Sequence, residues 1–135
     1  MAIKFPSDAW IKALMEDLNK SEAYAEAAKN WEGDFYFVVE PGGPIKEQVT
    51  LYMDLYHGKC REAHGVTNPA EKTPAFVMSA GYDSWVKVLK AQLDPIQGLM
   101  TRKLKLKGNQ VMIMKNVKAA QELVKCCALV PTEWV

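Results

Sequence analysis

The sequence predicts an α+β fold, in which a mostly antiparallel sheet has helices covering one face. Near the start of the chain, and again after residue 82, apolar residues recur every three or four positions, as on one face of a helix. Between these stretches apolar and polar residues alternate, as in a strand with one covered face. The expected order is one helix, four strands, two helices, one strand and two helices.

The first predicted helix covers about residues 8–29. Ser7 and Asp8 are good N-terminal capping residues, and Pro6 precedes them. One face of this helix is formed by Trp10, Leu14, Leu18, Ser21, Ala25 and Ala28.

An antiparallel hairpin follows, with its turn at Pro41–Pro44. Its predicted inner face is formed by Phe35, Phe37, Val39, Val49, Leu51, Met53 and Leu55, and its outer face includes Thr50, Tyr52, Asp54 and Tyr56. The stretches 59–66 and 73–79 are the expected third and fourth strands.

The C-terminal part begins with a helical pattern from Tyr82, on which Trp85, Val86, Leu89 and Leu93 share one side. Asp94 and Pro95 predict the start of a short helix that ends near residue 101. A short strand with Leu104 and Leu106 inward comes next, then one or two helical turns after Gly108. A last helix, capped by Asn116, is expected through residue 128.

Composition limits the classes of function. The chain has 135 residues and a net charge of +1, with 49% hydrophobic and 24% charged residues, which favours one globular domain spanning 1–135. A nucleic-acid binder usually has a strong basic excess or a dense basic patch, and because we expect neither from this sequence, no nucleic-acid partner is expected. The first residues, MAIKFPSDAW, lack the apolar core of a secretion signal, so a cytoplasmic location is expected.

The cysteines do not predict a disulfide framework or a zinc site. Their number is odd, Cys126 and Cys127 are adjacent, and Cys60 has no second cysteine at C-x-x-C spacing. We expect three reduced thiols, no metal and no cofactor.

Four stretches of the chain carry a resemblance to a known family: AAKNWEGDFYFVV, LYMDLYHGKC, TPAFVMSAGYDSWVKVLKAQLDP and LDPIQGLMTRKLKLKGN. Together they resemble the sterol carrier protein 2 family over nearly the whole chain. The last stretch is the most specific, because LDP opens a short helix with an apolar-Met pair, and a Lys-Leu strand ending in glycine follows. Two positions depart from the family pattern: Arg102 stands where glycine is common, and Gly98 where alanine is usual.

The resemblance implies a five-stranded sheet and an apolar tunnel between sheet and helices. The tunnel would hold a fatty acid, fatty acyl-CoA, phospholipid or sterol, which the protein binds and transfers without chemistry on the ligand. From the sheet, the expected lining residues are Phe35, Phe37, Leu51, Met53, Leu55, Leu104 and Leu106. From the helices, they are Trp85, Leu89, Ile96, Leu99, Met100, Met112, Val124 and Cys127. Taken alone, the same apolar stripes are also typical of an ordinary packed core.

Basic residues are the candidates for binding a lipid head group at the tunnel mouth. They are Arg102, Lys103 and, at the end of the first helix, Lys29. The alternative is that they are solvated surface charges. The row of Lys103, Lys105 and Lys107 could contact anionic lipid in a transient encounter with a membrane, or be the wet face of an edge strand.

Two other classes of function have candidate residues. A regulatory or assembly module would dimerise or dock on a lipid-metabolising enzyme, with Trp134 in the tail VPTEWV as a docking element, so a monomer and a homodimer both remain open. An enzyme would use His57 and Cys60, but no orienting group or oxyanion hole is evident, so we expect no catalysis. The carboxylates Glu32, Asp34 and Asp54 are expected to be surface charges of the hairpin.

Overall fold

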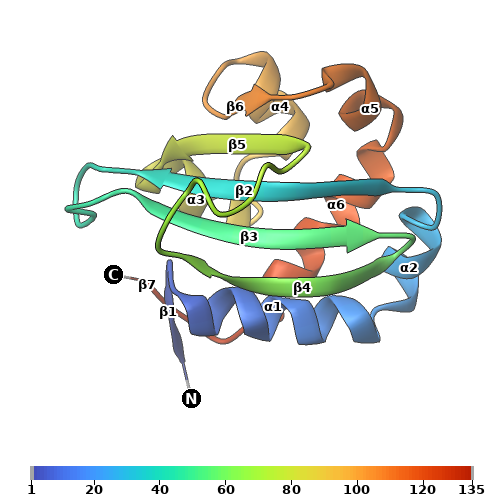
Figure 1. Cartoon of the computed structure of the whole chain (residues 1–135), viewed down its shortest axis with the longest axis horizontal. Coiled ribbons are helices and arrows are strands. Elements are labelled where there is room, and N and C mark those ends of the chain that lie inside the picture. The colour runs from blue at the N-terminus through green and yellow to red at the C-terminus, as the bar shows by residue number, and fades with distance from the viewer. Residues whose placement is uncertain (1, 135) are drawn as a thin grey trace.

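The central element of the fold is a five-stranded sheet, seen in a computed structural model that describes residues 2–134. Its strands are β2 (Glu32–Glu40), β3 (Val49–Tyr56), β4 (Lys59–Val66), β5 (Phe76–Gly81) and β6 (Lys105–Lys107). Their order across the sheet is β4-β3-β2-β5-β6 (Figure 1). All neighbours are antiparallel except β2 and β5, which are parallel. The predicted α+β class with a mostly antiparallel sheet is therefore confirmed.

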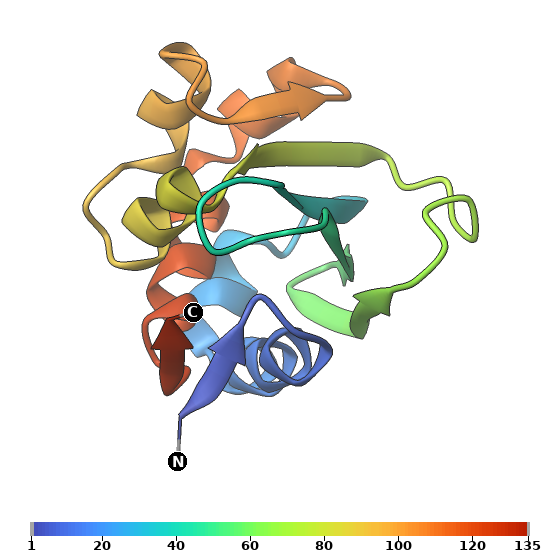
Figure 2. The same cartoon turned by 90° about the vertical axis from the view of Figure 1, so that its left-hand side faces the viewer.

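Residues 2–134 also form six helices. They are α1 (Asp8–Lys20), α2 (Glu22–Ala27), α3 (Tyr82–Leu89), α4 (Pro95–Met100), α5 (Gln110–Lys115) and α6 (Val117–Cys127). Most of them pack on one side of the strands, and the turned view separates this layer from the sheet (Figure 2). Two of the predicted caps form: the side chains of Ser7 and Asp94 accept hydrogen bonds from backbone N–H groups in the first turns of α1 and α4. Asn116 precedes α6 as predicted, but its side chain makes no capping hydrogen bond.

The predicted single helix over residues 8–29 is wrong, because the helix breaks at Ser21. This residue ends α1 with extended backbone angles (φ −85°, ψ 111°), and its side chain accepts a hydrogen bond from the N–H of Tyr24, which lies in the first turn of α2. A serine competes well for backbone hydrogen bonds outside a helix, so it ends one segment and caps the next. The break directs the buried Tyr24 toward the core.

A second, two-stranded sheet joins the two ends of the chain. In it β1 (Ile3–Phe5) pairs in parallel with β7 (Thr132–Trp134), a pairing that the sequence did not predict. The ring of Trp134 lies 5.8 Å from that of Phe5, edge to face, so this part of the tail packs against its own chain. Residues 132–134 are therefore held by β1, and Trp134 does not lie on a free tail as a docking element would.

The outer face of the hairpin is less exposed than predicted. Thr50 and Tyr52 are buried, and Tyr52 forms a small cluster with Tyr36 and Val38. The connection between β4 and β5 crosses this face (Figure 1), and the Tyr36 hydroxyl donates to the carbonyl oxygen of Pro69 in that connection (3.0 Å). A sheet with one helix-covered face thus also has a loop over part of the other.

Candidate functional site

An apolar cavity lies between the inner face of the sheet and the helices. It has a volume of about 110 Å³ for the centres of water-sized spheres, whereas a single water needs roughly 10–15 Å³ on that measure. Its sheet side is formed by Phe35, Phe37, Val39, Leu51, Met53, Leu55 and Met78. Facing these are residues from all six helices, among them Trp10, Leu14, Tyr24, Trp85, Leu89, Leu99, Ile113, Leu123 and Val124.

Three tryptophans line the cavity, and each has its indole N–H bonded elsewhere. Trp10 donates to the Thr132 hydroxyl (2.9 Å), Trp31 to the Gly33 carbonyl (3.0 Å) and Trp85 to the Val38 carbonyl (2.8 Å). A buried indole N–H without an acceptor would cost free energy or recruit a polar guest. With these donors satisfied, the tryptophans contribute apolar ring surface to the wall.

Aromatic rings form a continuous part of this wall. Phe35 stacks on Phe37 with ring centroids 5.1 Å apart, and Phe37 meets Trp85 edge to face at 5.9 Å. These contacts join strand β2 to helix α3 across the cavity. The rings fix the spacing of the two layers, because large aromatic side chains cannot collapse into the space as short ones would.

The ionisable groups of the lining are neutral. Burial raises the pKa of the Cys127 thiol, and burial likewise raises the pKa of the Tyr24 phenol. Both groups therefore keep their protons near neutral pH. The one amide side chain in the lining, that of Asn116, donates from its Nδ2 to the Met112 carbonyl (2.7 Å) at the junction of α5 and α6.

Most of the residues that the sequence proposed for the tunnel lie around this cavity. They are Phe35, Phe37, Leu51, Met53, Leu55, Trp85, Leu89, Ile96, Leu99, Leu104, Val124 and Cys127. Three others do not line it: Met100 is 72% exposed, while Leu106 and Met112 are half-buried beside the core. Met100 points outward because it ends α4 one position after the inward Leu99.

Sequence reasoning missed the contribution of the N-terminal segment. Phe5, Trp10, Ile11 and Leu14 line the cavity from β1 and α1. The apolar face of this helix was visible in the sequence, but the sequence does not say which side of the sheet the helix covers. Trp31, just before β2, was also missed, although its position between helix and strand favours burial.

The predicted head-group residues lie on the surface near the cavity. Arg102 and Lys103 are exposed, and they occupy the turn between the lining residues Leu99 and Leu104. Lys29 is exposed and pairs with Glu26 (3.0 Å). Arg102 has φ +62°, in the left-handed region that glycine tolerates best, which explains why glycine suits this position.

Gly98, the second departure from the family pattern, lies against the cavity wall. A Cβ at this position would come within 2.9 Å of Leu104 Cγ and Cδ1. Leu104 is 1% exposed and lines the cavity, so a larger residue at 98 would push its side chain into the open space. Glycine here therefore widens the cavity at this point.

The pair His57 and Cys60 is not arranged as a nucleophile and its base. The Cys60 thiol is buried and donates to the Glu62 carbonyl (3.4 Å), whereas the exposed His57 bonds the Glu32 carboxylate through Nε2 (2.6 Å). Burial raises the pKa of Cys60 to about 12, so the thiol is protonated and a poor nucleophile near neutral pH.

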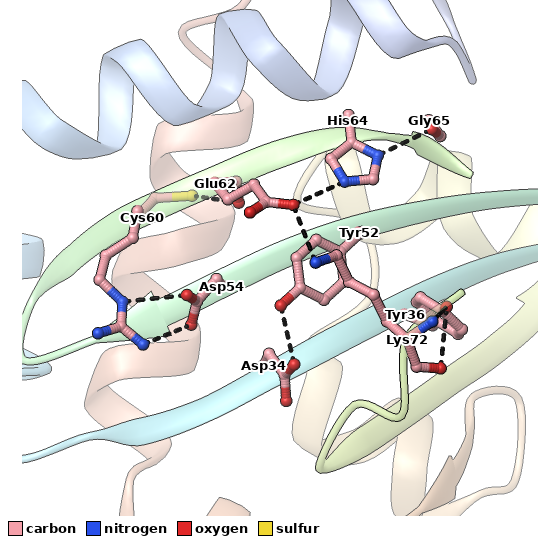
Figure 3. A network of polar contacts seen from close by, with 10 residues as sticks. Asp34, Tyr36, Tyr52, Asp54, Cys60, Glu62, His64, Gly65 and Lys72 are labelled. Atoms are coloured by element: carbon pink, nitrogen blue, oxygen red, sulfur yellow. Dashed lines mark hydrogen bonds and ion pairs between the residues drawn. The ribbon is translucent and has the colours of Figure 1, made fainter. Parts of the chain in front are cut away.

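The remaining candidate carboxylates belong to a polar network on the outer face (Figure 3). Asp34 accepts hydrogen bonds from the Tyr52 hydroxyl (2.9 Å) and the Ala75 N–H (2.7 Å). Asp54 forms a two-point ion pair with Arg61 at 3.0 and 3.2 Å. Burial, together with the hydrogen bond to Asp34, raises the pKa of Tyr52. These contacts hold the hairpin and the loop together, and no acid–base pair faces a cleft among them.

Comparison with known proteins gives a consistent result. The SCP-2 sterol transfer family matches residues 11–121. A crystal structure of sterol carrier protein 2 is 37% identical, with a TM-score of 0.82 over 92% of this chain and 97% of that one. A Thermus thermophilus protein, described as possibly a sterol carrier protein, is 38% identical, with a TM-score of 0.84 over 93% and 88% of the two chains. No curated protein matches the sequence.

A more distant structure shares the fold alone. Sterol carrier protein 2 from Yarrowia lipolytica is 17% identical, with a TM-score of 0.60 over 87% of this chain and 88% of that one. In residues 2–134, no helix has the length and apolar character to cross a membrane.

Proposed function

Because the chain belongs to the SCP-2 sterol transfer family, we propose that it binds an apolar lipid in the cavity between sheet and helices and carries it without chemistry on the ligand. The observation that carries the proposal is the cavity itself, whose walls are apolar and whose tryptophan donors are satisfied within the chain. Such a wall offers favourable burial to hydrocarbon and little to a charged metabolite.

The size of the cavity limits how large a ligand fits without movement of the wall. At roughly 10–15 Å³ per water-sized group, about 110 Å³ leaves room for roughly seven to eleven such groups. A longer acyl chain or a sterol needs the wall to move. Met53 and Met78, two unbranched side chains in the sheet wall, can repack around such a ligand at little cost.

The energetics suit a carrier. Burying an acyl chain of about sixteen methylenes gives on the order of 13 kcal/mol at ~0.8 kcal/mol each, part of which is lost in immobilising the ligand. A lipid that comes from a bilayer is already out of water, so it gains little further on entering the cavity. Loading and release are then close to balanced.

The head group of a bound lipid would lie at the surface turn that carries Arg102 and Lys103. This turn joins two lining residues, Leu99 and Leu104, so its two cations are close in the chain to the cavity wall. The buried cavity needs no charged anchor, and an exposed cation can pair with a carboxylate or phosphate while both stay solvated.

The test is direct binding. We expect native mass spectrometry of protein purified from cells to show a co-purified lipid, and fluorescent cis-parinaric acid to bind and be displaced by oleate, palmitoyl-CoA or cholesterol. No co-purified lipid, together with no binding of any of these probes, would contradict the proposal.

A graded series in the wall sharpens the test. Ala119, on α6, is buried and lines the cavity, so Ala119→Leu and then Ala119→Phe should fill it progressively. We expect the Phe variant to lower the affinity for cis-parinaric acid at least about tenfold, equal to about 1.4 kcal/mol. The matched control is Gln121→Phe, on the same helix but exposed, which should bind normally. Equal affinities of the three variants would show that the ligand binds elsewhere.

A further inference from the structure

Charge is unevenly distributed along this chain. Residues 95–121 contain six basic side chains and no acidic one, while the other residues contain 11 basic and 16 acidic side chains. The six are Arg102, Lys103, Lys105, Lys107, Lys115 and Lys118. The net charge of +1 hides this separation. We call residues 95–121 the basic cap; it comprises α4, β6, α5 and the first turn of α6.

The basic cap is one continuous region of the fold. Both views place α4, β6 and α5 together beyond strand β5, at one end of the molecule (Figures 1 and 2). Strand β6 forms that edge of the sheet. Cations that are scattered over 17 positions of the sequence are thus gathered at one end.

Large apolar side chains protrude from the same region. Met100 is 72% exposed, Val111 59% and Met114 41%. They account for three of the five exposed large hydrophobic side chains among residues 2–134, the others being Tyr56 and Leu129. Single apolar side chains scattered over a surface are ordinary, whereas several in one region mark a contact site.

The cations of the cap are available to a partner. Among residues 2–134, Lys105 is the one cap cation with an acidic partner, Glu40, at 3.2 Å on the neighbouring part of the sheet. The other five cap cations lie on exposed residues with no ion pair in the described chain. The cap therefore carries both unpaired cations and exposed apolar side chains.

We propose that the basic cap docks the protein on an anionic lipid bilayer. A bilayer offers what the cap lacks, phosphates and carboxylates for the cations and hydrocarbon for Met100, Val111 and Met114. Single-stranded nucleic acid is bound through stacking on aromatic rings, and residues 95–121 contain no Phe, Tyr or Trp. Duplex DNA would pair with the cations, but its phosphate backbone offers no hydrocarbon to the exposed Met100, Val111 and Met114.

Docking through the cap would bring the cavity wall to the membrane. Leu99 lines the cavity and the next residue, Met100, is exposed; Ile113 lines the cavity and Met114 is exposed. The same short helices therefore separate the cavity from the proposed lipid surface. This part of the proposal rests on the proposed function, since it gives the carried lipid a route between bilayer and cavity.

Vesicle sedimentation tests the docking. We expect the protein to bind vesicles of phosphatidylcholine mixed with phosphatidylserine, to release them as salt is added, and not to bind phosphatidylcholine alone. Replacing Lys107, Lys115 and Lys118 together by glutamine should weaken binding about 100-fold, because each cation near an anionic surface contributes about fivefold.

Matched variants control for net charge and for exposed apolar area. Lys20, Lys46 and Lys59 are exposed and lie outside the cap, so their replacement by glutamine gives the same net charge and should leave vesicle binding nearly unchanged. Met100→Ser with Val111→Ser should weaken binding several-fold, whereas Leu129→Ser, 65% exposed outside the cap, should not. Circular dichroism and melting temperature confirm that each variant is folded.

The outcomes separate this inference from the proposed function. Equal losses in cap and control variants, or binding indifferent to salt and lipid charge, would overturn the docking proposal, as would a preference for duplex or single-stranded DNA over the vesicles. Binding of cis-parinaric acid in solution by the cap lysine variant should stay normal. A protein that binds anionic vesicles but no lipid probe would retain the docking surface and lose the carrier function.

Discussion

At the β4 edge of the sheet, most charged side chains have partners within the chain, whereas at the β6 edge nearly all of them lack one. His64 and Lys72 both contact the Glu62 carboxylate, at 2.8 and 3.2 Å, and the Gly65 N–H donates to Asp8 at the start of α1 (2.7 Å). The β6 edge instead carries the basic cap with its exposed methionines. The charged groups at the β4 edge are thus mostly paired within the fold, whereas those at the β6 edge are free for the membrane contact proposed above.

The largest loss of stability is expected for Asp34→Ala. This substitution leaves the buried Tyr52 hydroxyl and the Ala75 N–H without their acceptor. We expect a loss of about 2–3 kcal/mol in the free energy of unfolding, measured with urea. Asp54→Ala is the control: it breaks an ion pair in which Arg61 is solvated, and should cost less than about 1 kcal/mol. Similar costs for the two would show that the network does not bind the loop to the sheet.

A smaller effect is expected on the β6 side, at Gly98. Alanine there adds about 1 kcal/mol of helix propensity but presses on Leu104, which can yield into the cavity. Stability should therefore change little, while affinity for cis-parinaric acid falls about fivefold, or about 1 kcal/mol. The expected result is therefore a lower affinity for cis-parinaric acid at an unchanged free energy of unfolding. A large loss of stability with normal binding would show instead that Leu104 cannot move into the cavity.

Arg102 links backbone strain to the proposed docking. Its φ of +62° disfavours any residue but glycine, so Arg102→Gly should raise stability by about 0.5–1 kcal/mol and weaken binding to anionic vesicles about fivefold. Ala91 is a matched control, because it is exposed with φ +59° and carries no charge. Ala91→Gly should stabilise similarly and leave vesicle binding unchanged. Loss of vesicle binding in both variants would assign the effect to flexibility.

The smallest expected effect is a pH dependence at the β4 edge. His64 Nδ1 faces the Gly65 carbonyl (2.9 Å) and Nε2 faces Glu62, so both ring nitrogens have acceptors and the charged form fits best. The hydrogen bond to Gly65, followed by that to Glu62, raises the pKa of His64; the hydrogen bond from His64, followed by that from Lys72, lowers the pKa of Glu62.

The direction of the shift sets the pH range. A raised histidine pKa contributes stability that is complete below the unfolded value of about 6.5 and is lost as pH rises through the folded value. The difference in the free energy of unfolding between wild type and His64→Gln, measured with urea, should therefore shrink from pH 5.5 to 8.5, by less than about 1 kcal/mol because Glu62 is half solvated. A constant difference across that range would mean that His64 is not charged in the folded protein.

The periodicity of the sequence predicted the hairpin well. The pairing of Phe35 with Met53 and of Phe37 with Leu51 puts the predicted inner residues side by side. These contacts are local, and a strand with a covered face has to alternate, so the pattern determines which side chains face inward. The same logic found Leu99 and Leu104, but it could not foresee that Met100, one residue on, would face outward.

The sequence did not predict the pairing of segments that are far apart in the chain. Strands β1 and β7 have three residues each and lie at opposite ends of the chain, too short for a periodic signal. The break at Ser21 was missed because an alanine-rich helical pattern continues through it. The sequence therefore left open whether the tail docks on a partner or folds back over its own core, and the first helix looked uninterrupted.

The α+β class, the inner face of the hairpin, the caps of α1 and α4 and the resemblance that indicates a lipid carrier could all be predicted from the amino-acid order. These features follow from short-range periodicity and capping chemistry, which every segment carries in its own residues. Three further properties became evident in the folded chain alone: α1 helps to enclose the cavity, the tryptophan N–H groups turn away from it, and six cations gather at one end. Those properties depend on which distant segments meet, and packing of the whole chain sets that.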